Sequence, residues 1–275
     1  MPYVSDGRIL IRRAYEGQYA MPAFNVCSLE MARACVTAAE RERAPIILQT
    51  YPGDLDHASP AVFAGLVRRL ADEASVPIML HLDHGDSQER IVQCLRAGYS
   101  SVMFDGEAHP LEDNIRLTRE LARTTSAAGA SLEAAAGSFG GGEGSDDDVH
   151  LTEPEVAARI LREGGADMVA CSVGSRHGQS SHLDLDRLRA VAEAIQGPIV
   201  IHGGSGIPAA DLAEAVRLGV VKVNIGAALF RALLAAWRST VGPAQTHYEV
   251  YAAARDALTT VAREKIRMMH ATGKA

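Results

Sequence analysis

Short apolar runs alternate with longer amphipathic segments along most of this chain. In the longer segments, such as residues 28–43 and 61–74, apolar residues return every three or four positions, which is the period of a helix with one buried face. The short runs are mostly rich in β-branched residues, as expected of strands that are buried on both faces. They span residues 19–26, 45–50, 77–84, 100–105, 130–137, 167–174, 198–204 and 220–226.

Strands that alternate with helices in this way predict an α/β fold, a closed (β/α)8 or TIM barrel. Proline or glycine stands where a helix should give way to the next strand, for instance at Pro45, Pro77, Gly165 and Pro198. An open, doubly wound sheet is the alternative architecture. The run at 130–137 is ambiguous in itself, because its alanines also favour a helix.

Two segments depart from this regular alternation. Residues 138–150 contain several glycines around Glu143, followed by a run of aspartates. This composition is too flexible to pack and too acidic to bury, so it predicts a mobile active-site loop at the barrel mouth. Residues 246–271 continue an amphipathic pattern beyond the eighth unit and predict a C-terminal helix, which would pack on a neighbouring subunit or cap the barrel floor.

The composition fits one globular unit with a small-molecule ligand. A chain of 275 residues without a linker, 47% hydrophobic and 22% charged, is expected to be one domain over residues 1–275. A formal net charge of −7 argues against nucleic acid or an anionic membrane as a partner. The cysteines show no CxxC spacing and the start of the chain shows no signal peptide, so a reduced, cytoplasmic location is expected.

Three histidines, His84, His177 and His202, stand at the carboxyl ends of separate expected strands, and each is followed by glycine. A single histidine in such a place is more often a hydrogen-bonded structural residue. The carboxyl ends of parallel strands converge on one mouth, however, so three imidazoles there can bind one metal and leave an outward position open. Nitrogen ligands favour zinc over magnesium. The pattern therefore predicts a catalytic zinc site.

Asp83 directly precedes His84. Because neighbouring strand residues face opposite sides, at least one of the two is expected to lie past the strand end. Asp83 is thus a candidate acid or base beside the metal, with a purely hydrogen-bonding role as the alternative. Asn25 and Asn224 end the first and eighth runs and are candidates either for substrate binding or for capping a turn.

The segment around Ser205 has the composition of an anion-binding loop. Gly203, Gly204 and Gly206 permit close backbone approach, and Pro208 starts a helix whose first amides are free. Phosphate sites are frequent at this place in such barrels, between the seventh and eighth strands. The segment alone is a weak signal, because many tight turns look similar.

In combination, the motifs resemble those of the class II, metal-dependent ketose-bisphosphate aldolases, a family that includes fructose- and tagatose-bisphosphate aldolases. The matching motifs follow one another over nearly the whole chain: PAFNV, HLDHG, SVMFD, LEA, the glycine-rich loop with Glu143, SVGSRHG, IHGGSG and KVNI. The resemblance implies one zinc per chain, bound by His84, His177 and His202. It also implies a phosphate site that includes Gly178, Gly203 and Ser205.

The implied reaction is the reversible aldol cleavage of a ketose or ketose phosphate. Zinc on the carbonyl and the neighbouring hydroxyl oxygen acts as a Lewis acid. By the same resemblance, Asp83 takes the proton of the C4 hydroxyl, Asn224 holds the zinc-bound enediolate, and Glu143 returns a proton to carbon. No lysine suited to a Schiff base is evident.

The chain departs from the family pattern in ways that bear on cations and phosphates. Asp105 and Glu133 match positions that can bind a second cation, but Ala135 replaces a further glutamate, which argues against that cation. Three replacements weaken the phosphate sites: Gly226 and Ala227 lack the usual hydroxyl, and Tyr248 falls nearest to a missing arginine. A small hydroxyl residue is usual where this chain has Tyr51. A substrate other than a bisphosphate is therefore expected.

Two other functions are compatible with parts of this pattern. A sugar epimerase or isomerase also forms an enediolate, and a metal-binding relative without activity would keep the histidines. Retention of Asp83, Glu143 and Asn224 beside the histidines favours an enzyme. The resemblance further implies a homodimer or homotetramer.

Overall fold

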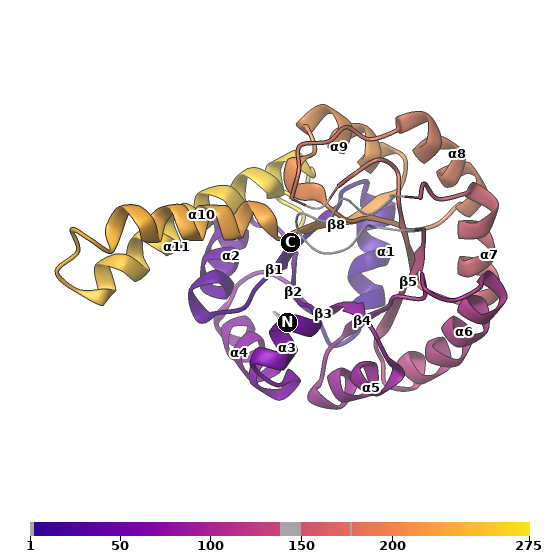
Figure 1. Ribbon diagram of the computed structural model, residues 1–275, viewed down its shortest axis with the longest axis horizontal. Coiled ribbons are helices and arrows are strands. Elements are labelled where there is room, and N and C mark those ends of the chain that lie inside the picture. The colour runs from indigo at the N-terminus through magenta and orange to yellow at the C-terminus, as the bar shows by residue number, and fades with distance from the viewer. Residues whose placement is uncertain (1–2, 138–149, 177) are drawn as a thin grey trace.

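The structure is a computed structural model that describes residues 3–137, 150–176 and 178–275. Its centre is a closed barrel in which eight parallel strands follow one another in sequence order (Figure 1). The predicted TIM barrel is therefore confirmed, and the open sheet is wrong. The strands are β1 (Met21–Asn25), β2 (Ile46–Thr50), β3 (Ile78–Gly85), β4 (Ser101–Phe104), β5 (Ser131–Ala136), β6 (Met168–Cys171), β7 (Ile199–Ile201) and β8 (Val220–Ile225).

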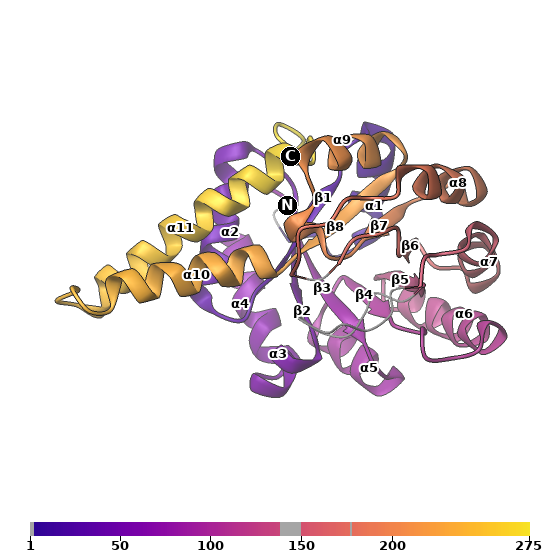
Figure 2. The same cartoon turned by 45° about the horizontal axis from the view of Figure 1, so that its top comes forward.

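Helices surround the barrel and cover the outer face of its strands (Figures 1 and 2). The helices of the described residues are α1 (Gly7–Gly17), α2 (Leu29–Glu42), α3 (Pro52–His57), α4 (Pro60–Glu73), α5 (Gln88–Ala97), α6 (Leu111–Ala127), α7 (Pro154–Gly164), α8 (Leu185–Ile195), the short 3-10 helix η1 (Gly204–Gly206), α9 (Ala209–Arg217), α10 (Ala227–Thr240) and α11 (His247–Met268). None of them is both long and apolar enough to cross a bilayer.

Packing in the barrel makes the alanine-rich run, whose secondary structure was ambiguous from the sequence, a strand. All six residues of β5 are buried, and Glu133 and Ala134 pair with residues of both β4 and β6. Small side chains suit a strand that is enclosed on both faces, because little space remains between the barrel interior and the surrounding helices. Tertiary context therefore overrides the helix propensity of alanine at this position.

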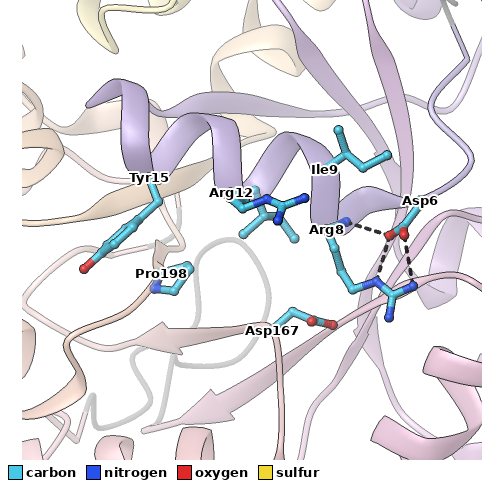
Figure 3. A pocket seen from close by; sticks show the side chains of 8 residues that line it. Asp6, Arg8, Ile9, Arg12, Tyr15, Asp167 and Pro198 are labelled. Carbon is cyan, nitrogen blue, oxygen red and sulfur yellow. Dashed lines mark hydrogen bonds and ion pairs between the residues drawn. The ribbon is translucent and has the colours of Figure 1, made fainter.

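The helix α1, which the hydrophobic pattern did not predict, closes the amino-terminal end of the barrel. It enters beneath the strands at Gly7, where a Cβ atom would lie 2.4 Å from Ser131 Oγ. A crevice of about 390 Å³ remains between α1 and the starts of β6 and β7 (Figure 3). Two residues that line the crevice, Arg8 and Asp6, form an ion pair at 2.8 Å. The crevice is thus at the opposite end of the barrel from the histidines.

The predicted C-terminal helix is confirmed as α11, which packs on α2 and α10 of its own chain. Helices α10 and α11 form a hairpin that projects beyond the barrel (Figure 1). Ion pairs at 2.7 Å from Arg263 and Arg267 to the buried carboxylate of Glu42 fasten α11 to α2. Nearly all of the predicted loop, residues 138–149 of 138–150, lies outside the described residues, and so do Glu143 and His177.

Candidate active site

The end of β3 brings Asp83 and His84 together at the mouth. The strand extends to Gly85, so the expectation that one of the two lies past the strand end is wrong. Instead, His84 has a φ angle of 51°, and the pairing of β3 with β4 shifts register between Leu82 and Gly85. Residues other than glycine rarely adopt this conformation, and those that do are often functional. The break in alternation leaves Asp83 Oδ1 only 3.9 Å from His84 Nε2.

His84 and His202 face each other across the barrel mouth. The distance from His84 Nε2 to His202 Nδ1 is 3.0 Å, and the two rings meet edge to face. The outer nitrogen of each ring donates to a carboxylate: His84 Nδ1 to Asp105 at 2.7 Å and His202 Nε2 to Glu133 at 2.9 Å. These bonds direct the inner nitrogens toward one point, an arrangement that is usual for histidines that bind a metal.

The donor set fits a divalent transition metal. One ligand atom each of Asp83, His84 and His202 lies within 4.8 Å of the others. Imidazole nitrogens with a carboxylate nearby suit zinc. The third predicted ligand, His177, lies outside the described residues, but its neighbours Arg176 and Gly178 belong to the loop that follows β6. That loop borders the histidine pair, because Arg176 backbone atoms lie close to Gly203, directly after His202.

Glu133 is engaged on both carboxylate oxygens. Its Oε1 accepts from His202, and its Oε2 pairs at 2.8 Å with Lys222 from β8, which is fully buried. His81 lies 3.4 Å from Oε2, and burial and the nearby Lys222 hold the pKa of His81 well below its usual value. The ammonium of Lys222 thus already supplies a positive charge beside Glu133. Glu133 and Asp105 each accept a hydrogen bond from a predicted metal ligand, His202 and His84 respectively.

Three amide side chains hold the carboxylate of Asp83. Asn25 and Gln49 donate to Oδ2 at 3.0 Å each, and Asn224 donates to Oδ1 at 2.8 Å. The two predicted asparagines thus meet Asp83, although they come from β1 and β8. Gln49 was missed by the sequence analysis, although a polar residue inside the apolar run of β2 was a usable signal. Within the described residues, Asn224 Oδ1 is buried without a hydrogen-bond partner, which is unusual unless a ligand is to be bound there.

The charges around Asp83 keep it ionised. Burial alone would raise the pKa of Asp83, but the charges of His84, His202 and Lys222 and the bond from Asn25 hold the pKa well below its usual range. Burial also disfavours the charged form of His84, whereas Asp83 and Asp105 raise the pKa of His84 to about 9. Metal binding at His84 therefore has to displace a proton. Asp83 remains a carboxylate that can accept one.

The predicted anion loop is more closely packed than its sequence suggested. A Cβ at Gly203 would lie 2.9 Å from Arg176 backbone, and a Cβ at Gly206 would lie 2.0 Å from the carbonyl oxygen of Gln179. The glycines are thus needed because the loop after β6 lies directly over the loop after β7. Ser205 Oγ accepts from the backbone of Ala228 at 3.1 Å, which leaves the hydroxyl proton available to a ligand.

Two cations lie beside this loop. Lys265 Nζ donates to the carbonyl oxygen of Ser205 at 3.0 Å, and Arg231 Nη1 donates to that of Gly178 at 3.1 Å. Burial lowers the pKa of Lys265, and the positive charge of Arg231 adds to this effect. No local sequence pattern marks these residues, because α10 and α11 reach the loop only in the folded chain. They add positive charge where the glycines and Ser205 offer hydrogen bonds.

We expect Asp105→Asn to weaken zinc binding by roughly 10- to 100-fold without unfolding the protein. Asp105 fixes His84 through Nδ1, and loss of such a contact typically costs metal affinity on this scale. Competition with a chromogenic chelator would measure the affinity. The matched control is Asp211→Asn, which removes the same type of contact from His182 outside the site. Unchanged zinc affinity in Asp105→Asn would contradict the positioning role.

Comparisons with known proteins identify the family of the chain. The family model "Fructose-bisphosphate aldolase class-II" matches residues 6–274. A fructose-bisphosphate aldolase of Streptococcus pneumoniae serotype 4 is 37% identical over 227 residues, 78% of this chain and 76% of that protein. A 6-phospho-5-dehydro-2-deoxy-D-gluconate aldolase of Bacillus licheniformis is 35% identical over 279 residues, 97% of this chain and 94% of that protein. The solved structure of the YdjI aldolase from Escherichia coli K12 has a TM-score of 0.89 at 32% identity and covers 98% of both chains.

A buried carboxylate beside converging imidazoles, at the carboxyl ends of the strands of a TIM barrel, is typical of an enzyme active site. The chain belongs to the class II fructose-bisphosphate aldolase family and is an aldolase, a carbon–carbon lyase. The resemblance inferred from the motifs is therefore confirmed.

Proposed function

We propose that this aldolase reversibly cleaves a ketose or ketose monophosphate between C3 and C4, with His84, His177 and His202 holding one zinc ion. The observation that carries the proposal is the carboxylate of Asp83, fixed by three amides next to the inner nitrogens of His84 and His202. When bound, the metal supplies a Lewis acid that polarises the ketone of the substrate. A second cation is not part of the proposal.

The protein's own groups would divide the proton transfers. Asp83 accepts the proton of the C4 hydroxyl, because it is ionised and its position is fixed. Asn224 offers its unpaired Oδ1 to a hydroxyl of the donor half, while its nitrogen holds Asp83. Glu143, outside the described residues, is proposed to return the proton to carbon, as its motif implies. Burial of Asp83 and His202 keeps bulk water away from the bond that breaks.

The surroundings of the site support one phosphate at most. Gly178, Gly203 and Ser205, with the charges of Arg231 and Lys265 beside them, can bind an anion at the loops after β6 and β7. In the described ranges, no comparable group is evident for a second phosphate. Tyr248, nearest in sequence to the missing arginine, lies 71% exposed in the first turn of α11, at the far end of the hairpin (Figure 1). The names of the relatives include both a bisphosphate and a monophosphate substrate.

We expect fructose 1,6-bisphosphate to be a poor substrate of the zinc-loaded protein. A bidentate arginine contact to phosphate contributes on the order of 2 to 3 kcal/mol, roughly a hundredfold in affinity, and a tyrosine cannot replace its charge. The test compares kcat/KM for fructose and tagatose 1,6-bisphosphates with the values for the 1-phosphates and the unphosphorylated ketoses. A preference of about a hundredfold or more for a bisphosphate would contradict the expectation.

An epimerase or isomerase reaction is the second candidate, because it needs the same enediolate chemistry. The two reactions differ in their products: an aldolase releases an aldehyde, which a coupled dehydrogenase or a hydrazine reagent detects. A ketose that changes configuration without release of an aldehyde would favour the second candidate. A metal-binding protein without activity would do neither.

We also propose that the protein is a homodimer or homotetramer. The hairpin of α10 and α11 projects from the barrel and carries five large apolar side chains that are exposed: Leu234, Trp237, Val241, Tyr248 and Tyr251. Such a concentration on one projecting element is typical of a surface that another subunit covers. Sedimentation or light scattering of the full chain would determine the number of subunits.

A further inference from the structure

The helix α3 forms a part of the mouth that the mechanism above does not use. It follows β2 directly and packs on β3, which carries Asp83 and His84. In a closed barrel of eight strands in sequence order, β2 lies across from β6, whose loop borders the anion site. A ketose held by one end near Ser205, with its reacting carbons at Asp83, therefore extends its other end toward α3.

Within α3, Asp54 is the residue whose charge interacts with that of Asp83. Its side chain is only 5% exposed, and one oxygen, Oδ2, accepts from the backbone nitrogen of Tyr51 at 3.1 Å. Burial raises the pKa of Asp54 to about 6, and the charge of Asp83 contributes to this rise. Asp54 in turn contributes to the raised pKa of Cys27, two residues beyond Asn25. The packing of α3 on β3, together with this interaction of charges, places Asp54 in the same corner of the mouth as Asp83.

In the described residues, the carboxylate of Asp54 has no cation that balances its charge. In the described part of the chain, no lysine, arginine or histidine forms an ion pair with Asp54. The nearby Arg90 is already paired with Asp56 at 3.1 Å and Asp86 at 2.9 Å. A buried carboxylate that lacks a cation is costly to the fold, so its retention needs a reason. The hydrogen bond from the Tyr51 nitrogen uses Oδ2 of Asp54 and leaves Oδ1 available to a ligand.

Tyr51 gives this corner a defined wall. A Cβ at Gly53 would lie 2.7 Å from the ring of Tyr51, so the ring lies directly against the first turn of α3. Arg90 also donates to the carbonyl oxygen of Pro52 at 3.4 Å, which joins α3 to the start of α5. The ring of Tyr51 offers an apolar surface to a ligand, and the carboxylate of Asp54 offers a hydrogen-bond acceptor. Neither side chain carries a positive charge that could bind a phosphate.

We propose that Asp54, framed by Tyr51, is a specificity-determining residue that excludes a phosphate from the far end of the ketose and accepts its neutral hydroxyl groups instead. This inference rests on the proposed function, because it assumes a ketose in the mouth. A phosphate dianion at this place would face two carboxylates, Asp54 and Asp83, in a partly desolvated setting, where like charges repel strongly. A terminal hydroxyl, by contrast, can donate to the available oxygen of Asp54.

The test measures binding rather than turnover. Hexitol 1-phosphate and hexitol 1,6-bisphosphate lack the ketone and cannot be cleaved, so calorimetry with the zinc-loaded protein reports the subsite alone. We expect the wild-type protein to bind the monophosphate at least about tenfold more tightly, as one removed like-charge contact would give. Asp54→Asn keeps an acceptor for the Tyr51 nitrogen but removes the charge, and it should bring the two affinities to within about twofold of each other.

Asp56→Asn is the matched control. It removes the same charge from the same helix, but its side chain is 72% exposed and paired with Arg90, so the preference should stay at the wild-type value. An unchanged preference in Asp54→Asn would overturn the inference. So would an equal loss of affinity for both hexitols, which would mark Asp54 as a structural cap, or a wild-type protein that binds neither or favours the bisphosphate. Failure to cleave any ketose, with the hexitol preference intact, would instead count against the proposed function.

Discussion

Asp83→Asn should abolish cleavage while the protein keeps its metal. We expect kcat to fall by roughly 10³-fold, within the range that general acid–base catalysis contributes, because an amide cannot accept the proton of the C4 hydroxyl. The zinc content should stay near the wild-type value, since the nitrogens of His84 and His202 remain in place. Single-turnover cleavage of the best ketose, together with elemental analysis of the same sample, would measure both quantities.

Asp113→Asn serves as the control for this substitution. Asp113 is an exposed residue in the first turn of α6 that pairs with Arg116, so the variant loses one carboxylate that contacts none of the site residues. A second comparison is Gln49→Ala, which removes one of the amides that hold Asp83 but leaves the carboxylate, and it should retain more activity than Asp83→Asn. If Asp83→Asn kept more than about a tenth of the wild-type rate with normal zinc, another residue would have to be the base.

The barrel could be predicted from the sequence because each of its strands is marked by a local pattern. Each buried strand is a short apolar run, and proline or glycine marks several of its boundaries, so the period of the pattern defines the order of elements. Even β5 could be placed, since eight runs at regular spacing complete a closed barrel. The helices α1 and α3 were not predicted. The helix α3 is short, and α1 precedes the first strand, so it lies outside the repeating pattern of strand and helix.

Several of the predicted site residues lie together in the structure, in a geometry that the sequence did not show. Asn25, Asp83, His84, His202 and Asn224 do converge, because the ends of parallel strands must meet at one mouth. What no local pattern shows is the direction of each side chain. The left-handed backbone of His84 turns its ring toward His202.

The contacts behind the histidines depend on closure of the barrel. Glu133 and Lys222 come from β5 and β8, and His202 directly follows β7, so the three residues are far apart in the sequence. Their pairing inside the barrel makes Glu133 a partner of a predicted metal ligand and of a buried ammonium at the same time. From the sequence alone, the same glutamate was a candidate for a second cation. Only the fold shows that both oxygens of Glu133 are engaged.

His202→Ala should remove both the bound zinc and the activity. The inner nitrogens of His84 and His202 converge to 3.0 Å, so the loss of one ring leaves the metal with too few nitrogen ligands to hold it at cellular concentrations. Without the Lewis acid, the carbanion that cleavage produces has no electron sink, and the rate should fall by at least about 10³-fold. Elemental analysis of protein purified without chelator would report the zinc content. Cleavage of the best ketose with and without added zinc would report the activity.

His182→Ala is the matched control for the histidine substitution. His182 also contacts an aspartate, Asp211 at 3.0 Å, but its side chain is 81% exposed and lies outside the predicted ligand set. Zinc content and activity should therefore stay at wild-type values in this variant. Treatment of the wild-type protein with EDTA should reproduce the defect of His202→Ala, and added zinc should reverse the defect only in the wild type. Full activity of His202→Ala, or of the EDTA-treated protein, would show that the histidine pair is not a catalytic metal site.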